Sequence, residues 1–376
     1  MKEVFITRVS GFLPNDPIGN DEMEGFLGFI NDAPSRARHI VLRNNGIKRR
    51  FYALDKQRRL THTNAELVFE AVKGLTGNGL ALTDLEVLAC GTSAPDQFLP
   101  SHASQVHGLM PHAMEIISPS GACCAGMQAL KYAHMSVASG NSRNAVATGS
   151  ELISPMMMAE NFQTEAERIA QLEKNPMIAF EKEFLRWMLS DGAGAALLEV
   201  QPRGECDLQV EWVVSRSFAN ELEACMYFGA EKEEGSRFRG WKTYSAAELA
   251  PHSIMSMKQD TRLLGKHMVP VAIKWLREVM DEKGVDIQEV QHFLPHLSSM
   301  YFRAQIEQEL LRHGLHVKES SWFLNLTEVG NIGSASIYLM LRDLIVAGKV
   351  KKGDRVLLMV PESARFSLSF ALLKAV

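Results

Sequence analysis

Three side chains, far apart along the chain, have the chemistry of an acyl-transfer site: Cys124, His296 and Asn331. Cys124 lies where a glycine-containing loop meets a predicted helix. Free N–H groups and the positive end of the helix dipole gather there, which lowers a thiol's pKa and can hold the oxyanion of an attacked thioester. A lone cysteine is more often inert packing, and that is the role expected for Cys123.

His296 and Asn331 each lie next to the end of a predicted strand or helix. His296 comes directly after an apolar strand predicted over 290–295, where α/β proteins place ligands, so it could act as a base or as a donor to a thioester oxygen. Asn331 begins a predicted helix after Gly330 and could be a second amide donor. Taken singly, a structural histidine and an N-cap or turn asparagine are the commoner interpretations.

The elements that must position these residues occur twice. In the first half a capping box at Thr63–Glu66 begins a one-faced apolar helix, followed by a strand over 85–90. In the second half a helix with the same apolar spacing leads into the strand over 290–295. Gly79 precedes Cys90 by 11 positions, and Gly284 precedes the end of the second strand by the same number.

Each half continues with a helix rich in Ala, Gly and Ser, and then with a strand that leads to a glutamate. From Cys124 to Glu151 is 27 positions, and from Ala335 to Glu362 is also 27. Small residues let helices approach closely, so both helices are predicted at the centre, between sheets. The repeat also brings the loops of the three polar residues to equivalent ends of the two units, where they can converge.

The repeat predicts a duplicated α/β fold with an N-terminal half over 1–200 and a C-terminal half over 201–376. The stretch 154–188 is rich in methionine and charge and is predicted to be a helical insertion. The stretch 203–265 is predicted to be an irregular insertion. Chance similarity of two ordinary α/β segments is the alternative.

The motifs resemble those of β-ketoacyl-ACP synthase III enzymes of the thiolase superfamily. SGACCAGMQAL is similar to the nucleophile segment, which implies Cys124 because Ala-Gly follows it. LPHLSS implies His296 as the active-site histidine, and VGNIGSASI implies Asn331 as the active-site asparagine. NNGIKRRFYA, CGTSAPD, TGSELIS and LSDGAGAALLEV also fit in order. The resemblance implies a thiolase-like, five-layer α-β-α-β-α fold with buried central helices.

The family implies that Cys124 accepts an acyl chain from a thioester and that His296 and Asn331 stabilise the enolate of a second thioester, so that a Claisen-type condensation forms a carbon–carbon bond. No bound cofactor or metal is implied; coenzyme A or phosphopantetheine thioesters are the substrates. Acyl carrier protein or acyl-CoA is the expected partner, and the family is typically a homodimer.

Several residues are expected to bind substrate or carrier. The basic run Lys48, Arg49 and Arg50 could dock a phosphopantetheine arm or carrier protein, although a solvated basic surface is equally plausible. Phe98 could reach toward a partner subunit. The remaining two mark departures from the family pattern: Ser299 replaces an asparagine, and Arg365 belongs to a segment that replaces a glycine-rich turn.

These departures, with Ser118 in place of an upstream aspartate, favour a specialised branch. PSRARHIVLRNNGIKRRFYA and MKQDTRLLGKH are similar to dialkylresorcinol-condensing enzymes, which implies lipid or polyketide biosynthesis with a dialkylresorcinol- or cyclohexanedione-like product. One alternative is a chain-initiating β-ketoacyl-ACP synthase III of fatty-acid synthesis. Another is a non-catalytic heterodimer partner that binds acyl carrier protein.

Composition excludes several other classes. The net charge of −4 gives no global field for nucleic acid, and no apolar run approaches the ~18 residues of a membrane span, so a cytoplasmic protein is expected. Five cysteines without framework spacing argue against disulfides, and metal-site motifs are absent from the sequence. A papain-like protease shares the order Cys, His, Asn, but ACCAG differs from its nucleophile segment. GLTGNG and DGAGAA are not dinucleotide-binding segments.

Overall fold

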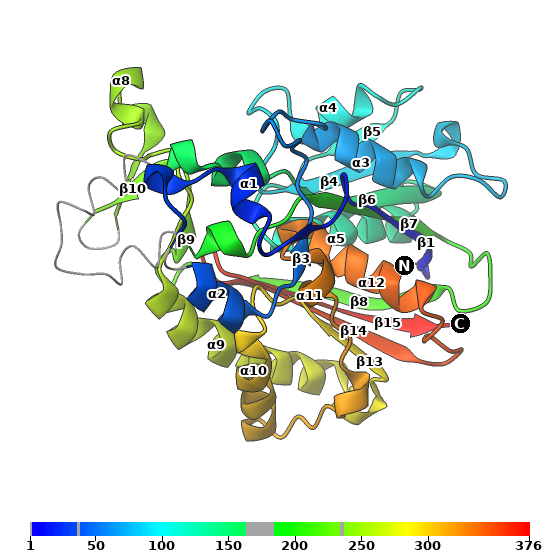
Figure 1. The fold of residues 1–376 in the computed structure, drawn as a ribbon. Helices are drawn as coiled ribbons and strands as arrows, with labels where there is room; N and C mark the ends of the chain where they lie inside the picture. Colours follow the sequence, from blue (N-terminus) through cyan, green and yellow to red (C-terminus); the bar gives the residue numbers. More distant parts are fainter. Residues whose placement is uncertain (1, 36–37, 163–183, 234–236) are drawn as a thin grey trace.

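The computed structural model describes residues 2–35, 38–162, 184–233 and 237–376. Among these residues, nine strands form one mixed sheet (Figure 1). The strand order is β13 (His292–Pro295), β14 (Arg355–Glu362), β15 (Ser367–Ala375), β8 (Leu208–Ser217), β1 (Phe5–Phe12), β7 (Gly192–Glu199), β6 (Asn144–Glu151), β4 (Val87–Thr92) and β5 (Glu115–Ile117).

The sheet consists of two similar halves. Strands β1 and β4 to β7 come from the first half of the chain, and β8 and β13 to β15 come from the second. The halves join only where β1 pairs with β8, through Phe5 with Gln209 and Ile6 with Leu208. Each half contains a parallel pair, β4 with β6 and β13 with β14, so the carboxyl ends of these strands point the same way within each half.

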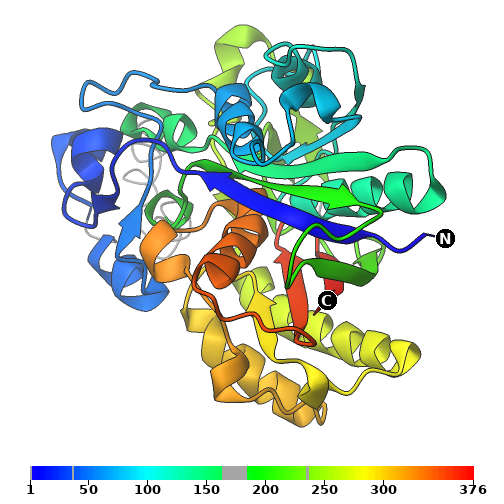
Figure 2. The same ribbon diagram turned by 90° about the vertical axis from the view of Figure 1, so that its right-hand side faces the viewer.

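Helices form three layers around the two half-sheets. The central helices α5 (Cys124–Ser139) and α12 (Ser336–Val346) lie between them (Figures 1 and 2). Helices α3 (Asn64–Lys73) and α4 (His102–His107) cover the first half-sheet, and α9 (Thr261–Lys283) and α10 (Tyr301–Arg312) cover the second. The predicted five-layer, thiolase-like arrangement with buried central helices is confirmed.

The close approach of the two halves depends on Gly126 in α5. A Cβ added there would lie 2.2 Å from the carbonyl oxygen of Ser334, at the turn that leads into α12. The Tyr338 hydroxyl donates to the Gly126 carbonyl oxygen over 2.7 Å. Any side chain larger than hydrogen would therefore push the two central elements apart.

Local sequence signals account for the outer helices. The predicted capping box is present at the start of α3, with Thr63 and Glu66 bonding each other's backbone N–H groups. Asp260 accepts from the N–H groups of Arg262 and Leu263 at the start of α9, and Gly284 ends that helix in the left-handed conformation. Both helices could be predicted from the sequence because each has capping residues at its ends and an apolar face between them.

The region 203–265 is less irregular than predicted. Its residues Leu208–Ser217 form β8, a full strand of the sheet between β1 and β15. The strand was missed because its second half, Val213–Ser217, is only partly buried or exposed and lacks a clear apolar alternation. The rest of the region is short: β9 (Met226–Tyr227), β10 (Ala230–Lys232), β11 (Phe238–Gly240), η7 (Trp241–Thr243), α8 (Ala246–Leu249) and β12 (Lys258–Gln259).

The predicted helical insertion over 154–188 falls largely outside the described residues. Its described ends hold three short 3₁₀ turns, η3 (Ser154–Met157), η4 (Ala159–Asn161) and η5 (Leu185–Trp187). The remaining elements are β2 (Ile18–Gly19), α1 (Met23–Leu27), η1 (Ile30–Asp32), α2 (Arg38–Asn45), β3 (Arg49–Arg50), η2 (Leu82–Asp84), η8 (Ile287–Glu289), η9 (Glu319–Ser321), α11 (Leu326–Val329) and η10 (Gly333–Ala335).

Membrane-spanning helices and metal-binding clusters are both absent from the described ranges. No helix in them has both the length and the hydropathy needed to cross a bilayer. No group of three or more His, Cys, Asp or Glu side chains in them is placed to hold a metal ion.

Candidate active site

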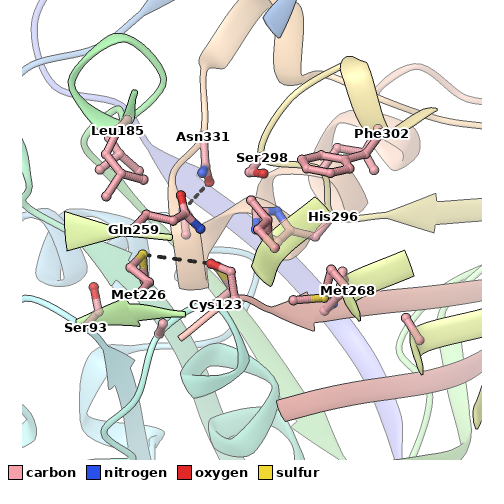
Figure 3. A pocket seen from close by; sticks show the side chains of 18 of the residues that line it. Ser93, Cys123, Leu185, Met226, Gln259, Met268, His296, Ser298, Phe302 and Asn331 are labelled. Carbon is pink, nitrogen blue, oxygen red and sulfur yellow. Dashed lines mark hydrogen bonds between the residues drawn. The ribbon is translucent and has the colours of Figure 1, made fainter. Parts of the chain in front are cut away.

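A pocket lies where the carboxyl ends of β4, β6, β13 and β14 meet the start of α5. Its polar lining consists of Ser93, Cys123, Glu151, His296 and Asn331, together with smaller contributions from serines and Gln259 (Figure 3). The other walls are apolar and come mainly from α9, α10 and the loops after β6 and before β7. The duplicated fold thus brings a thiol, an imidazole and a carboxamide from distant segments to one pocket.

The two adjacent cysteines have different surroundings. Cys123 is half-buried and lines the pocket, whereas Cys124 does not. Cys124, the first residue of α5, is 2% exposed and packs in the core. Its thiol donates to the carbonyl oxygens of Val360 at 3.3 Å and Ser367 at 3.6 Å. Successive helical residues point about 100° apart, so one cysteine of the pair faces the pocket and the other faces the sheet. Of the two cysteines, Cys123 is therefore the one that lines the pocket with His296 and Asn331.

A signal for this arrangement exists in the sequence. Residues three apart share a face of a helix, so Cys123 and Gly126 point the same way. Gly126 is, with Gly149, one of two glycines of the first half that pack tightly against the Ser334 carbonyl of the second half, and that half supplies His296 and Asn331. The cysteine three residues before the close-contact glycine is therefore the one directed at the other half's polar residues.

His296 is held at the carboxyl end of β13, as predicted. Its backbone N–H donates to the carbonyl oxygen of Met359 over 2.8 Å, which continues the pairing of β13 with β14. The side chain is 3% exposed, and burial lowers the pKa of the imidazole to about 4. Among the described residues no hydrogen bond to the ring is found. At neutral pH the ring is therefore uncharged and can offer one N–H to a ligand in the pocket.

Asn331 lies in the turn before α12 rather than at a helix N-cap. Its backbone N–H donates to the Met188 carbonyl over 3.0 Å, and its own carbonyl accepts from the Ser190 N–H over 2.9 Å. Its side-chain oxygen accepts from the Gly333 N–H over 3.0 Å. Because the oxygen is used within the turn, the amide NH₂ group is the part that can donate to a substrate oxygen.

The lowered pKa that was expected for the Cys124 thiol is found at neither cysteine. Burial raises the pKa of both thiols, and the nearby carboxylate of Glu362 raises it further. The N–H groups that would stabilise a thiolate are occupied, because Oε2 of Glu362 accepts from Ala122 at 3.0 Å and from Cys124 at 3.1 Å. The resting thiol is therefore protonated, and a base or a rearrangement is needed to generate the thiolate.

Glu151 is a second buried carboxylate, and it lines the pocket. Its Oε2 accepts from the Ser93 hydroxyl at 2.5 Å and from the Ser93 N–H at 3.3 Å, and its Oε1 accepts from the Ser334 N–H at 3.0 Å. Burial raises the pKa of Glu151 to about 7. Both oxygens are thus engaged, and they link the loop after β4 to the start of η10.

The basic run predicted for carrier docking is divided by the fold. Lys48 and Arg49 are exposed, and Arg49 lies 3.9 Å from Glu328. Arg50 is fully buried; its guanidinium donates to Asn20 at 2.6 Å and to the Trp187 carbonyl at 3.5 Å. Arg50 therefore holds β3 against its neighbours and has no surface with which to meet a carrier.

The other predicted binding residues lie outside the pocket lining. Phe98 is 67% exposed and stacks on Trp241 with ring centroids 5.7 Å apart. Ser299 is buried at the start of α10, where its hydroxyl accepts from the Tyr301 N–H at 3.2 Å. Arg365 is exposed and donates to the Leu222 carbonyl at 3.3 Å. Ser298 lines the pocket where Ser299 was expected to do so.

Comparisons with known proteins agree with the fold. Residues 280–361 match the family model "3-Oxoacyl-[acyl-carrier-protein (ACP)] synthase III C terminal". Along its length the chain is 23% identical, over 360 residues, to the β-ketoacyl-ACP synthase III of Clostridium perfringens, with 95% of each protein covered.

Solved structures of the same architecture superimpose over nearly the whole chain. The tetronic acid condensing enzyme AbyA1 gives a TM-score of 0.76 at 20% identity, covering 99% of this chain and 100% of that one. An OleA variant of Xanthomonas campestris gives 0.76 at 19% identity, covering 99% and 98%. These likenesses show the thiolase-type fold. Along its length the chain is similar to β-ketoacyl-ACP synthase III enzymes, and its C-terminal part matches their family model.

Proposed function

We propose that this protein joins two acyl thioesters by a Claisen-type condensation in which Cys123 carries the first acyl group. The observation that supports this most directly is the pocket shared by Cys123, His296 and Asn331. The thiol attacks the carbonyl carbon of the first thioester, and the coenzyme A or phosphopantetheine thiol leaves with a proton. Splitting the reaction through a covalent intermediate divides one difficult step into two easier ones.

The second step uses the two neutral donors. The α-carbon of the second thioester loses carbon dioxide or a proton, and the electron pair of the broken bond forms the enolate. Its oxygen accepts from the His296 N–H and from the Asn331 amide, which stabilises the negative charge. The enolate carbon then attacks the acyl carbon on Cys123, the C–S bond breaks, and the Cys123 thiolate takes up a proton. No residue in this scheme needs a bound metal or redox cofactor.

The apolar walls support a long aliphatic acyl group. Met226, Met257 and Met268 line the pocket beside Leu264 and Ala272 of α9. Methionine side chains adapt to irregular shapes, so these walls can repack around a flexible chain. An OleA structure with bound lauric acid and lauroyl-CoA has the same fold as this chain, with a TM-score of 0.75 at 18% identity.

The proposal extends to specialised lipid or polyketide biosynthesis with a dialkylresorcinol- or cyclohexanedione-like product. Its support is the sequence resemblance to that branch and the segment from Glu362 to Arg365, which replaces the family's glycine-rich turn and whose Glu362 carboxylate accepts from the Ala122 N–H before α5. Chain initiation in fatty-acid synthesis is the second candidate, favoured by the 95% mutual coverage with the Clostridium perfringens synthase.

The substrates are proposed to arrive on coenzyme A or on acyl carrier protein, with Lys48 and Arg49 near the approach of the phosphopantetheine arm. A homodimer is proposed, with the exposed Phe98 and Leu99 at the contact between subunits. Charge reversal at Lys48 and Arg49 that leaves KM for acyl-carrier substrates unchanged would reject the docking role.

Intact-protein mass spectrometry after exposure to octanoyl-CoA tests the acyl-enzyme. The wild type and Cys124→Ala should gain one octanoyl group, and Cys123→Ala should gain none. Labelling that persists in Cys123→Ala but is lost in Cys124→Ala would move the nucleophile back to Cys124. A wild type that is never acylated would indicate the non-catalytic partner instead.

Product analysis separates the two candidate pathways. Octanoyl-CoA is offered with a β-ketoacyl thioester or with a malonyl thioester. Six-membered-ring diketone products from the first pair support the specialised branch. Simple β-ketoacyl products that form only from the second pair support chain initiation.

A further inference from the structure

The condensation proposed above leaves two polar side chains of the pocket without a role. Ser298 and Gln259 both line the cavity, and Figure 3 shows them around the same space as His296 and Asn331. Most of the remaining wall is apolar. Polar groups in a mainly apolar pocket fix the orientation of a ligand that has matching polar atoms. The two side chains are therefore candidates for contacts with a further polar atom of the substrate.

The hydroxyl of Ser298 is available to a ligand. His296, Leu297 and Ser298 are consecutive residues after β13, and all three line the pocket. Among the described residues the Ser298 hydroxyl makes no hydrogen bond, whereas that of the next residue, Ser299, accepts from the Tyr301 N–H outside the pocket lining. A hydroxyl can donate one hydrogen bond and accept two. Ser298 can therefore donate to an oxygen of a substrate that also contacts His296.

Gln259 brings a side-chain amide to the pocket from a different part of the chain. It ends β12, which pairs with β9 through Gln259 opposite Met226, and both residues line the pocket. Gln259 is 6% exposed, and the one contact found for its amide within the described chain is with the Cys225 thiol. Sulfur is a weak hydrogen-bond partner, so this buried amide keeps most of its hydrogen-bonding capacity for a ligand.

The charges of the lining decide which kind of oxygen fits this place. Glu151 lines the pocket, and no lysine or arginine of the described chain does so. A carboxylate is costly to bury without a cation, whereas a ketone oxygen needs only a neutral donor. A hydroxyl and an amide, in a pocket that also contains an acidic residue, therefore favour a ketone over the free carboxylate of a malonyl group.

We infer that Ser298 and Gln259 form a specificity-determining subsite for a second substrate oxygen, the ketone oxygen of a β-ketoacyl thioester. The inference rests on the function proposed above and names the class of its second substrate. In such a thioester the thioester and ketone carbonyls flank the carbon that becomes the nucleophile. His296 and Asn331 bind the thioester oxygen, and Ser298 and Gln259 bind the ketone oxygen. Both oxygens of the delocalised enolate are then hydrogen-bonded.

The experiment uses two probes that differ only in the ketone oxygen, 3-oxooctanoyl-CoA and octanoyl-CoA. Their dissociation constants are measured by calorimetry on Cys123→Ala, which lacks the proposed nucleophile and leaves the thioesters intact. Adding Ser298→Ala or Gln259→Met should weaken the binding of 3-oxooctanoyl-CoA by about three- to tenfold, the effect of one neutral hydrogen bond. The ratio of the two dissociation constants should change by the same factor, because octanoyl-CoA has no oxygen for the subsite.

Turnover gives a second measurement on the enzyme with Cys123 intact. Ser298→Ala and Gln259→Met should each lower kcat/KM for condensation with 3-oxooctanoyl-CoA by a similar factor, while mass spectra should still show acylation by octanoyl-CoA. Ser299→Ala is the matched control, because it removes a neighbouring hydroxyl that lies outside the pocket lining. Any loss of affinity in this control should be equal for the two probes.

An equal loss of affinity for both probes in Ser298→Ala and Gln259→Met would reduce these residues to packing and overturn the inference. Unchanged binding of 3-oxooctanoyl-CoA would do the same. If these variants do not fold, Cys123→Ala alone decides the question. It should bind 3-oxooctanoyl-CoA about tenfold or more tightly than octanoyl-CoA, as expected for two hydrogen bonds, and equal affinities would contradict the subsite.

Two outcomes keep the inference separate from the proposed function. A wild type that is acylated by octanoyl-CoA and condenses the acyl group with malonyl-CoA, but not with 3-oxooctanoyl-CoA, overturns the subsite and leaves the condensing function standing. A wild type that is never acylated overturns the function itself.

Discussion

Replacing His296 tests whether this residue acts as a neutral donor or as a base. Its pKa of about 4, lowered by burial from 6.5, corresponds to a preference for the neutral ring of about 3 kcal/mol. At pH 7 about one ring in a thousand carries the second proton. A residue in this state cannot supply an imidazolium, and a ring with so low a pKa is a weak base. The chemistry left to it is donation of one N–H to the enolate oxygen.

The size of the expected rate loss follows from the role of His296 as a donor. Removing one preorganised donor costs about 100- to 1,000-fold in kcat, or about 3–4 kcal/mol. His296→Ala should therefore lose about this much in the condensation step, with acylation of Cys123 much less affected. His296→Gln keeps an amide N–H in nearly the same place and should recover part of the loss. His102→Gln is a matched control, because His102 is also buried with a pKa lowered to about 4, yet it lies outside the pocket lining.

The assay separates the half-reactions by rapid quenching, with mass spectrometry for acyl-enzyme and chromatography for product. The wild-type condensation rate should show no ionisation of His296 between pH 5.5 and 8. An acidic limb near pH 6.5 that disappears in His296→Gln would show that the ring titrates in the working range. Equal losses in acylation and condensation would show that His296 activates the thiol, and either result would refute the donor role.

Three further predictions concern packing, chain length and stability. Gly126→Ala should destabilise the protein by about 3 kcal/mol in thermal melts, because its Cβ would lie 2.2 Å from the Ser334 carbonyl, whereas Gly204→Ala, with nothing within 4 Å, should be nearly neutral. Ala272→Leu should lower kcat/KM at least about tenfold for long acyl-CoA substrates and less for short ones, because it fills the apolar wall on α9. For Glu151→Gln, urea unfolding should show the wild type losing up to about 3 kcal/mol relative to the variant between pH 4.5 and 7, since a pKa raised to about 7 favours the folded state only while the carboxyl is protonated. A pH-independent difference would contradict the raised pKa.

The layers and the convergence of the site could be predicted because they depend on periodicity and on repetition. The capping box at Thr63, the apolar face of α9 and the equal spacing to Glu151 and Glu362 are local or countable signals. The strand β8 could not be predicted in the same way. It gains its place from pairing with β15 and β1, which are remote in sequence, and its outer half, Val213–Ser217, lacks a clear apolar alternation.

The choice between Cys123 and Cys124 illustrates a finer limit. Motif order places the nucleophile near both, but the direction of a side chain at a helix start depends on how that helix is rotated in the core. That rotation is set by Gly126 against Ser334, a contact between residues 208 positions apart. Arg50 shows the same limit. Lys48 and Arg49, which precede it, are exposed, whereas the Arg50 side chain is buried and donates to Asn20.

Two glutamates at equivalent strand ends show where the two copies of the repeat diverge. In the first half, Ser93 follows β4 and donates to Glu151, while Ser334 donates to the other oxygen of the same carboxylate, so Glu151 holds structure. The equal spacing from Gly79 to Cys90 and from Gly284 to Pro295 makes Ser298 the equivalent of Ser93 in the second half. Among the described residues Ser298 does not donate to Glu362, whose carboxylate instead accepts from the Ala122 and Cys124 N–H groups, and Ser298 lines the pocket with His296. The two copies therefore keep the carboxylate and its contact with the opposite half, and they differ in whether the serine that follows the strand bonds it.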